Sequence, residues 1–135
     1  MPAARQPPAP PEREARTRAF TAAERRVIAR LMEEEGAHRV IATGGGAFCN
    51  DETRALILER GIAVWLDSDV ATLVERTARK DNRPLLADGD PREIIERLRE
   101  ERRPAYEQAP IHVMSGNGPH GRVVANVLKG IEQWL

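Results

Sequence analysis

The stretch Ala42-Thr43-Gly44-Gly45-Gly46-Ala47 decides the fold, and it follows directly on the short apolar run Arg39-Val40-Ile41. Three consecutive glycines at a strand end carry no side chains, so a ligand can approach the backbone closely there. Exposed amides in such a loop can donate hydrogen bonds to hydroxyl or carboxylate oxygens. A glycine triplet alone is equally compatible with a plain tight turn. Its meaning therefore depends on the elements around it.

Charge and cysteine content exclude several classes of protein. The 135 residues hold 21 basic and 21 acidic side chains, so bulk charge does not favour binding to nucleic acid or to an anionic membrane. The single cysteine, Cys49, excludes an intrachain disulfide and suits a reducing compartment. No apolar run is long enough to be a signal peptide or a membrane span. We expect a cytoplasmic protein with neither nucleic acid nor membrane as a partner.

The N-terminal residues are predicted to lie outside the folded domain. Residues 1–18 are rich in proline and then in alternating charge, which favours an extended, disordered tail. The domain is expected over residues 19–135. Its first helix is expected at Thr21-Ala22-Ala23-Glu24, which has the form of a capping box.

Strand and helix patterns alternate along the rest of the chain, which is typical of an α/β protein with a parallel sheet wrapped by helices. The predicted strands are 39–43, 62–66 and 111–114. Helices are predicted to begin after the caps Asn50 and Ser68 or Asp69, at Pro91 in a first helical turn, and at Gly121. The helix from Gly121 to Leu135 is expected to turn five apolar side chains inward, namely Val123, Val124, Val127, Leu128 and Ile131.

Basic residues gather near a charged loop at Lys80–Asp90. Arg76 and Arg83 stand where cations can meet a polyphosphate, although a solvated basic face is the alternative interpretation. Arg83 differs from its neighbours because Pro84 fixes it and two leucines follow, a pattern that can hold a loop over a site.

A third candidate arginine, Arg102, is expected at the end of the helix that begins at Pro91. Arg103-Pro104 is expected to break that helix before Tyr106. A guanidinium in this place suits bidentate capture of a carboxylate. It could equally complement the carbonyl end of the helix.

Taken together, these segments resemble a shikimate kinase, a member of the nucleoside-monophosphate-kinase-like group of P-loop kinases. The resemblance runs from about Phe20 to Leu135. It rests on the order and spacing of four segments: Phe20 with Glu24–Ile28, Gly44-Gly45-Gly46, Arg83-Pro84-Leu85-Leu86, and Arg102 to Tyr106. It implies a three-layer parallel sheet with flanking helices, incomplete at its N-terminal part. The implied reaction is the ATP-dependent phosphorylation of shikimate to 3-phosphoshikimate in chorismate and aromatic amino acid biosynthesis, with Mg²⁺.

The resemblance also implies roles for particular residues. The glycines Gly44, Gly45 and Gly46 would form the substrate loop, and Gly45 and Arg102 would touch shikimate. Arg83, in a lid at about residues 80–90, would approach the ATP phosphates. Arg76 and the turn at 115–119 would flank adenine.

The chain departs from the family pattern in the residues that carry the chemistry. No segment has the form G-x-x-x-x-G-K-[ST], and by the resemblance the family's Asp-x-Asp segment lies upstream of the residues that match, so no catalytic residue and no Mg²⁺ ligand is assigned. Thr21 stands where the family has an arginine. By the resemblance, the family's first strand would lie between residues 40–43 and 62–66. We therefore expect a truncated chain that is inactive alone and only marginally stable.

Two other hypotheses stay open. One is a non-catalytic module that binds shikimate or nucleotide, or that complements a separate N-terminal half. The other is a related small-molecule kinase, such as a gluconate kinase.

Overall fold

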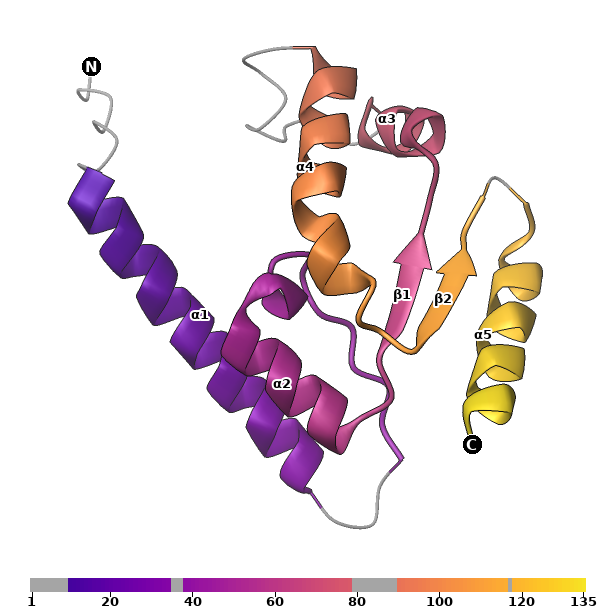
Figure 1. Ribbon diagram of the computed structural model, residues 1–135, viewed down its shortest axis with the longest axis horizontal. Coiled ribbons are helices and arrows are strands. Elements are labelled where there is room, and N and C mark those ends of the chain that lie inside the picture. Colours follow the sequence, from indigo (N-terminus) through magenta and orange to yellow (C-terminus); the bar gives the residue numbers. More distant parts are fainter. Residues whose placement is uncertain (1–9, 35–37, 79–89, 117) are drawn as a thin grey trace, which may run out of the picture. The chain divides into compact units, whose positions relative to one another are not determined.

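The computed structural model describes residues 10–34, 38–78, 90–116 and 118–135 (Figure 1). The chain divides into two compact units, Met1–Leu56 and Ile57–Leu135, which are described separately below. Residues 79–89 fall outside the described part of the chain. Arg83 and almost all of the expected lid therefore have no structural description.

The first unit is helical. It contains α1 (Pro10–Glu33), the short 3-10 helix η1 (Ala47–Cys49) and the beginning of α2 (Asp51–Arg60). Its buried side chains are Ile28 on α1, Ala47 on η1 and Thr53 on α2. An ion pair between Arg25 Nη1 and Glu52 Oε2, 2.6 Å apart, links α1 to α2.

The start of α1 corrects the prediction for the N-terminal segment. The helix begins at Pro10, so residues 10–18 are helical rather than extended. Proline fits the first turn of a helix, and the Ala, Arg and Glu residues that follow are strong helix formers. Thr21 is not a cap, because it lies inside the helix and its hydroxyl donates to the Thr17 carbonyl at 2.8 Å. Residues 1–9 lie outside the described part of the chain.

The predicted strand at 39–43 is wrong. These residues adopt no regular structure, and the Val40 side chain is fully exposed. None of the five makes a backbone–backbone hydrogen bond to another described residue. A β-strand is stable only when a neighbouring strand pairs with its N–H and C=O groups. The apolar run alone was therefore insufficient to produce a strand.

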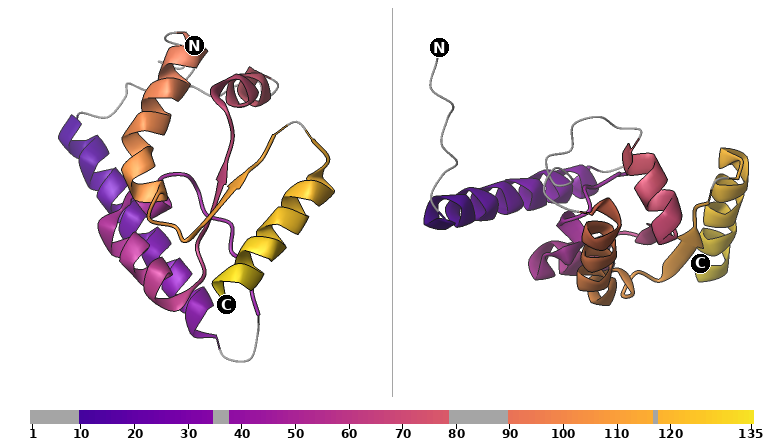
Figure 2. Two further views of the ribbon diagram at one scale, coloured as in Figure 1. Left: turned by 45° about the vertical axis from the view of Figure 1, so that its right-hand side comes forward. Right: turned by 90° about the horizontal axis from the view of Figure 1, so that it is seen from above.

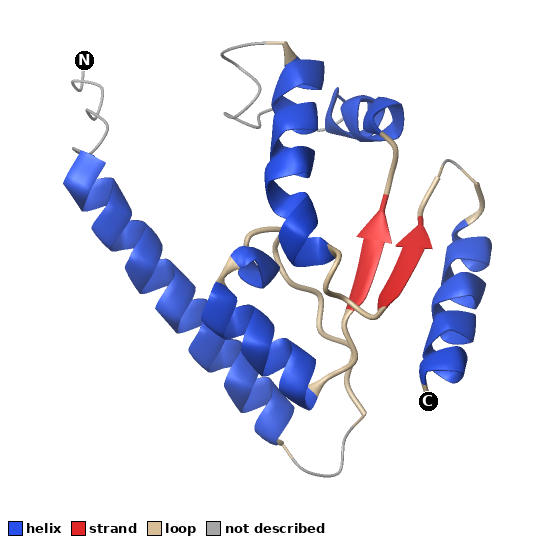
Figure 3. Cartoon of the chain, in the orientation of Figure 1, coloured by secondary structure: helices blue, strands red, loops and turns tan. Residues whose placement is uncertain are grey.

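The second unit is an α/β arrangement, as predicted. Strands β1 (Val64–Asp67) and β2 (Ile111–Met114) pair in parallel, with Val64 opposite Ile111 and Asp67 opposite Met114. Figure 3 shows this pair with helices on either side. The helices are α3 (Val70–Ala78), α4 (Pro91–Tyr106) and α5 (His120–Trp134), and α5 lies beside β2 in every view (Figures 1 and 2). No described helix is both long enough and apolar enough to cross a membrane.

Local signals in the sequence correctly predicted where α2, α3 and α4 begin. The side-chain oxygen of Asn50 accepts a hydrogen bond from the Thr53 amide at 3.0 Å, so Asn50 caps α2. In the same way, the Asp69 carboxylate accepts from the Thr72 amide at 2.7 Å and caps α3. Pro91 stands in the first turn of α4, as predicted.

Element ends and one helix face differ from the predictions. The second predicted strand, 62–66, is observed at Val64–Asp67, and α4 continues through Pro104 to Tyr106 instead of breaking there. On α5, Val124 and Leu128 are exposed rather than inward. The helix packs on β2 along a narrower stripe, where Gly130 approaches Ile111 closely.

Candidate functional site

The glycine triplet forms a turn in the first unit. Ala47 N donates to the Gly44 carbonyl at 3.2 Å, and Cys49 N donates to the Gly46 carbonyl at 3.1 Å. These bonds lead the chain from the exposed glycines into η1 and then into α2. The Gly44 Cα lies near the Glu24 carboxylate, because a methyl built on it would stand 3.9 Å from Oε2. The turn thus presents glycine backbone to solvent beside an acidic side chain of α1.

Arg76 connects the loops that follow the two strands of the second unit. Its guanidinium donates to Ser68 Oγ at 3.2 Å, to Ser115 Oγ at 3.4 Å and to the Gly116 carbonyl at 3.0 Å. Ser68 Oγ in turn donates to the Ser115 carbonyl at 2.6 Å. Both loops stand at the carboxyl ends of parallel strands, which is where ligands bind in open α/β sheets. Arg76 is therefore held in a fixed position at this edge.

The last residue of β1, Asp67, is a buried carboxylate with three donors. Arg99 Nη2 lies 3.2 Å from Oδ2 and 3.5 Å from Oδ1, the Ser68 amide donates to Oδ1 at 2.8 Å, and His112 Nε2 lies 2.9 Å from Oδ2. Burial by itself raises the pKa of this carboxyl group, but the bonds from His112, Arg99 and the Ser68 amide outweigh it and hold the pKa below its usual value. Asp67 is therefore a charged anchor inside the unit.

Aromatic rings extend this anchor along the same strand face. Trp65 lies opposite His112 in the strand register, and the two rings stack at a centroid distance of 4.1 Å and an interplanar angle of 10°. Trp65 also contacts Tyr106, at the end of α4, with centroids 5.7 Å apart. Side chains two residues apart on a strand share a face. Trp65 and Asp67 thus both hold α4 from one side of β1.

Arg102 is placed on α4 between these contacts. Its side chain is half-buried, and it makes no ion pair or hydrogen bond with any described residue. A half-buried guanidinium with free donors is suited to bidentate binding of a carboxylate. Its position near the end of α4 agrees with the prediction, although the helix does not stop at Pro104.

The structure divides the predicted site residues between the two units. Gly44, Gly45 and Gly46 lie in the first unit, while Arg76 and Arg102 lie in the second on α3 and α4. Sequence reasoning missed Asp67 and Arg99. The signal available was an aspartate at the end of a buried strand, but the predicted strand stopped at Leu66 and left Asp67 outside it.

The donor set does not fit a metal ion. Among residues 10–34, 38–78, 90–116 and 118–135, no group of three or more His, Cys, Asp or Glu side chains could hold one. Mg²⁺ takes oxygen ligands in an octahedral arrangement. No Mg²⁺ ligand is assigned to this part of the chain.

Comparison with known proteins gives one family throughout. The shikimate kinase family model matches residues 12–132, beginning before Phe20, where the resemblance was expected to start. Among curated relatives, a shikimate kinase of Novosphingobium aromaticivorans is 63% identical over 118 residues, covering 86% of this chain and 61% of the relative. One from Caulobacter vibrioides is 50% identical over 115 residues, covering 85% and 56%.

A shikimate kinase of Brucella canis is 44% identical over 110 residues, covering 82% of this chain and 54% of the relative. The chain thus spans between 54% and 61% of the length of these three relatives. No solved structure matches. Because the family model covers most of the chain and agrees with the α/β arrangement, the chain belongs to the shikimate kinase family.

Proposed function

We propose that this chain takes part in the transfer of a phosphoryl group from ATP to shikimate, giving ADP and 3-phosphoshikimate, in the cytoplasmic route to chorismate and the aromatic amino acids. The observation that carries the proposal is Arg102, a half-buried guanidinium without a partner among the described residues, on a helix held at two points. Family membership supports shikimate as the substrate.

The family resemblance implies a role for each candidate residue, and the geometry of the described ones suits it. By the family resemblance, Arg102 would bind the shikimate carboxylate, for which its two terminal nitrogens are suited, and Gly44–Gly46 would form the substrate loop. Arg76 would lie against the adenine ring, since its three acceptors hold the guanidinium in one place. Arg83 would approach the ATP phosphates, as the resemblance implies.

Phosphoryl transfer depends on positioning and on stabilising the charge of the transferred group. That work falls to a glycine-rich phosphate loop with its lysine, a motif that the 135 residues do not contain, and to metal ligands, none of which is assigned among the described residues. We propose that these residues form the acceptor-binding part of the enzyme and that a phosphate-loop segment from outside this sequence completes it. ATP and Mg²⁺ would bind to the completed protein.

A coupled ADP-release assay tests the proposal. The chain is assayed with Mg²⁺, ATP and shikimate, alone and with the part of the Novosphingobium aromaticivorans relative that lies outside its matched region. We expect no shikimate-dependent turnover alone and measurable turnover with the added segment. Arg102→Ala should abolish that gain, whereas Arg97→Ala, an exposed position on the same helix, should keep it. Turnover by the chain alone would contradict the need for a separate phosphate loop.

The missing phosphate-loop motif also favours a second candidate, a module that binds shikimate without catalysis. A calorimetric titration with shikimate separates the two. Binding with a Kd below about 10 mM, equivalent to about 3 kcal/mol, and no turnover when the segment is added would support the module. Absence of binding at that concentration would exclude it.

A further inference from the structure

The strand β1 holds α4 at two points that lie two helical turns apart. Asp67 binds Arg99, and Trp65 contacts Tyr106. His112 on β2 connects these two contacts, because its ring stacks on Trp65 and its Nε2 bonds to Asp67. We call these five residues the α4 clamp. Arg99 and Tyr106 are about 10.5 Å apart along a helix that rises 1.5 Å per residue. The clamp therefore fixes both the rotation and the tilt of the last turns of α4.

Arg102 lies between the two points of the clamp. It follows Arg99 by three residues and precedes Tyr106 by four, so all three share one face of the helix. Its own guanidinium binds no described residue, so among the described residues only the helix backbone and local packing set where it points. The orientation of Arg102 is thus inherited from the clamp.

Burial makes the Asp67 contact a strong one. The Asp67 side chain is 7% exposed and that of Arg99 is 25% exposed. The ion pairs elsewhere on α4 are more exposed, with both side chains of Arg92–Glu96 at least half exposed. Exposed pairs contribute little, whereas a buried carboxylate that loses its partner leaves an uncompensated charge.

We propose that Asp67, acting through Arg99, is a positioning residue for shikimate: it holds α4 so that Arg102 faces the shikimate carboxylate. This inference rests on the proposed function, in which Arg102 receives that carboxylate. Asp67 itself touches no substrate. A displacement of about 1 Å at a binding group can cost up to about a hundredfold, so loosening the clamp should weaken shikimate binding specifically.

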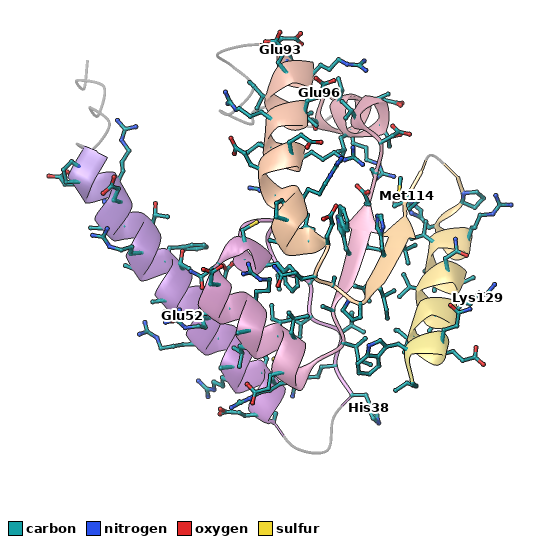
Figure 4. The ribbon with its side chains drawn as sticks, in the orientation of Figure 1. His38, Glu52, Glu93, Glu96, Met114 and Lys129 are labelled. Atoms are coloured by element: carbon teal, nitrogen blue, oxygen red, sulfur yellow. The ribbon has the colours of Figure 1, made fainter. Side chains whose placement is uncertain are left out.

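Titration of shikimate into the 135-residue chain tests the proposal with four variants. Asp67→Asn keeps the shape of the side chain and removes its charge, Arg99→Met removes the partner, and the double variant removes both. Arg99→Lys keeps the positive charge. Glu96→Gln is the control, because it breaks the exposed pair with Arg92 near the start of α4 (Figure 4). Circular dichroism establishes that each variant is folded at the temperature used.

We expect Asp67→Asn and Arg99→Met each to raise the shikimate Kd by about tenfold, and the double variant to raise it no further, because both act on one contact. Arg99→Lys should stay within about threefold of the original chain, and Glu96→Gln should not change the Kd. A wild-type Kd in Asp67→Asn, or fully additive effects in the double variant, would overturn the proposal.

Hydrogen exchange gives a readout that does not depend on shikimate. In Asp67→Asn, the amides of residues 102–106 other than Pro104, which has no N–H, should exchange about tenfold faster, while those near the start of α4 keep their rates. If the original chain binds no shikimate, the proposed function fails, and exchange alone then decides whether the clamp exists. Unchanged exchange at 102–106 would show that Asp67 does not hold this end of α4.

Discussion

Gly130→Ala probes the packing of α5 on β2, which bounds the α/β unit on one side. A methyl group at Gly130 would stand 2.7 Å from Ile111 Cγ2, closer than real side chains approach. Ile111 is buried, at 5% exposure, and belongs to the paired strand β2. The helix or the strand must therefore shift to admit a single methyl group.

Two opposing effects set the magnitude. Replacing glycine by alanine inside a helix gains about 0.8–1.0 kcal/mol in helix propensity. Forcing an extra methyl group into a packed contact costs about 1–3 kcal/mol. We therefore expect Gly130→Ala to lower the free energy of unfolding by about 1 kcal/mol. At Gly121, in the first turn of the same helix, no heavy atom lies within 4 Å of a built methyl. Gly121→Ala should raise stability by about 0.5 kcal/mol.

Urea unfolding followed by tryptophan fluorescence measures both variants, because Trp65 and Trp134 both lie in the second unit. The midpoint should fall for Gly130→Ala and rise for Gly121→Ala, with the slope unchanged. Combining Gly130→Ala with Ile111→Ala should cost less than the sum of the two changes, since Cγ2 is then gone. Equal stabilisation by both glycine substitutions would refute the close approach of α5 to β2.

Three further predictions concern Asp67, the helix cap Asn50 and the ring of Trp65. The pKa of Asp67 is held below its unfolded value, so the stability that Asp67 contributes is present above the unfolded pKa and is lost as the pH falls through the folded pKa. Between about pH 6 and about pH 3, the urea midpoint should therefore fall more for the original chain than for Asp67→Asn. Parallel curves for the two proteins would contradict this. Asn50→Ala removes the oxygen that accepts hydrogen bonds from the amide and from the buried hydroxyl of Thr53, and should lower the free energy of unfolding by about 1–2 kcal/mol, measured by circular dichroism in urea. The control is Asp51→Ala, which removes an exposed ion-pair partner of Arg54 and should cost less than about 0.5 kcal/mol. Trp65→Phe shortens the ring that stacks on His112 and contacts Tyr106, and should speed amide exchange at residues 102, 103, 105 and 106. Rates equal to those of the original chain would argue against this end of the clamp.

The parts of the fold that sequence predicted correctly depend on local chemistry. Asn50, Asp69 and Pro91 start helices through hydrogen bonds and backbone angles that lie within a few residues of them. The strand at 111–114 and the parallel arrangement also followed from the alternation of patterns. Such features need little knowledge of the rest of the chain.

The parts that failed depend on what a segment packs against. Residues 39–43 have the composition of a strand, but pairing is a tertiary property and no described backbone pairs with them. Proline at position 104 is a helix breaker on local grounds, yet α4 continues through it to Tyr106, whose ring contacts Trp65. Residues 10–18 show the reverse, since helix formers there outweighed the prolines before them.

The sequence predicted only part of the candidate site, because some of its contacts form only in the folded unit. Arg102 stood out because it ends a helical pattern in a family-like segment, whereas Asp67 and Arg99 are 32 residues apart and meet only in the folded unit. A single charged residue at the end of a buried strand is a usable signal, but its partner cannot be read from its sequence neighbours. The family resemblance suggested shikimate as the proposed ligand, and the structure supplied the contact between Asp67 and Arg99 on the helix that carries Arg102.

The most direct test of the central claim is a nuclear magnetic resonance titration of the 135-residue chain with shikimate, observing the side-chain Nε–H of Arg102 and the amides of Gly44–Gly46. The account predicts saturable shifts at Arg102, which Arg97→Ala keeps, and saturable shifts at the glycine amides, which Arg97→Ala keeps and Arg102→Ala abolishes. Unchanged signals at Arg102 up to about 10 mM shikimate, an affinity below about 3 kcal/mol, would contradict it.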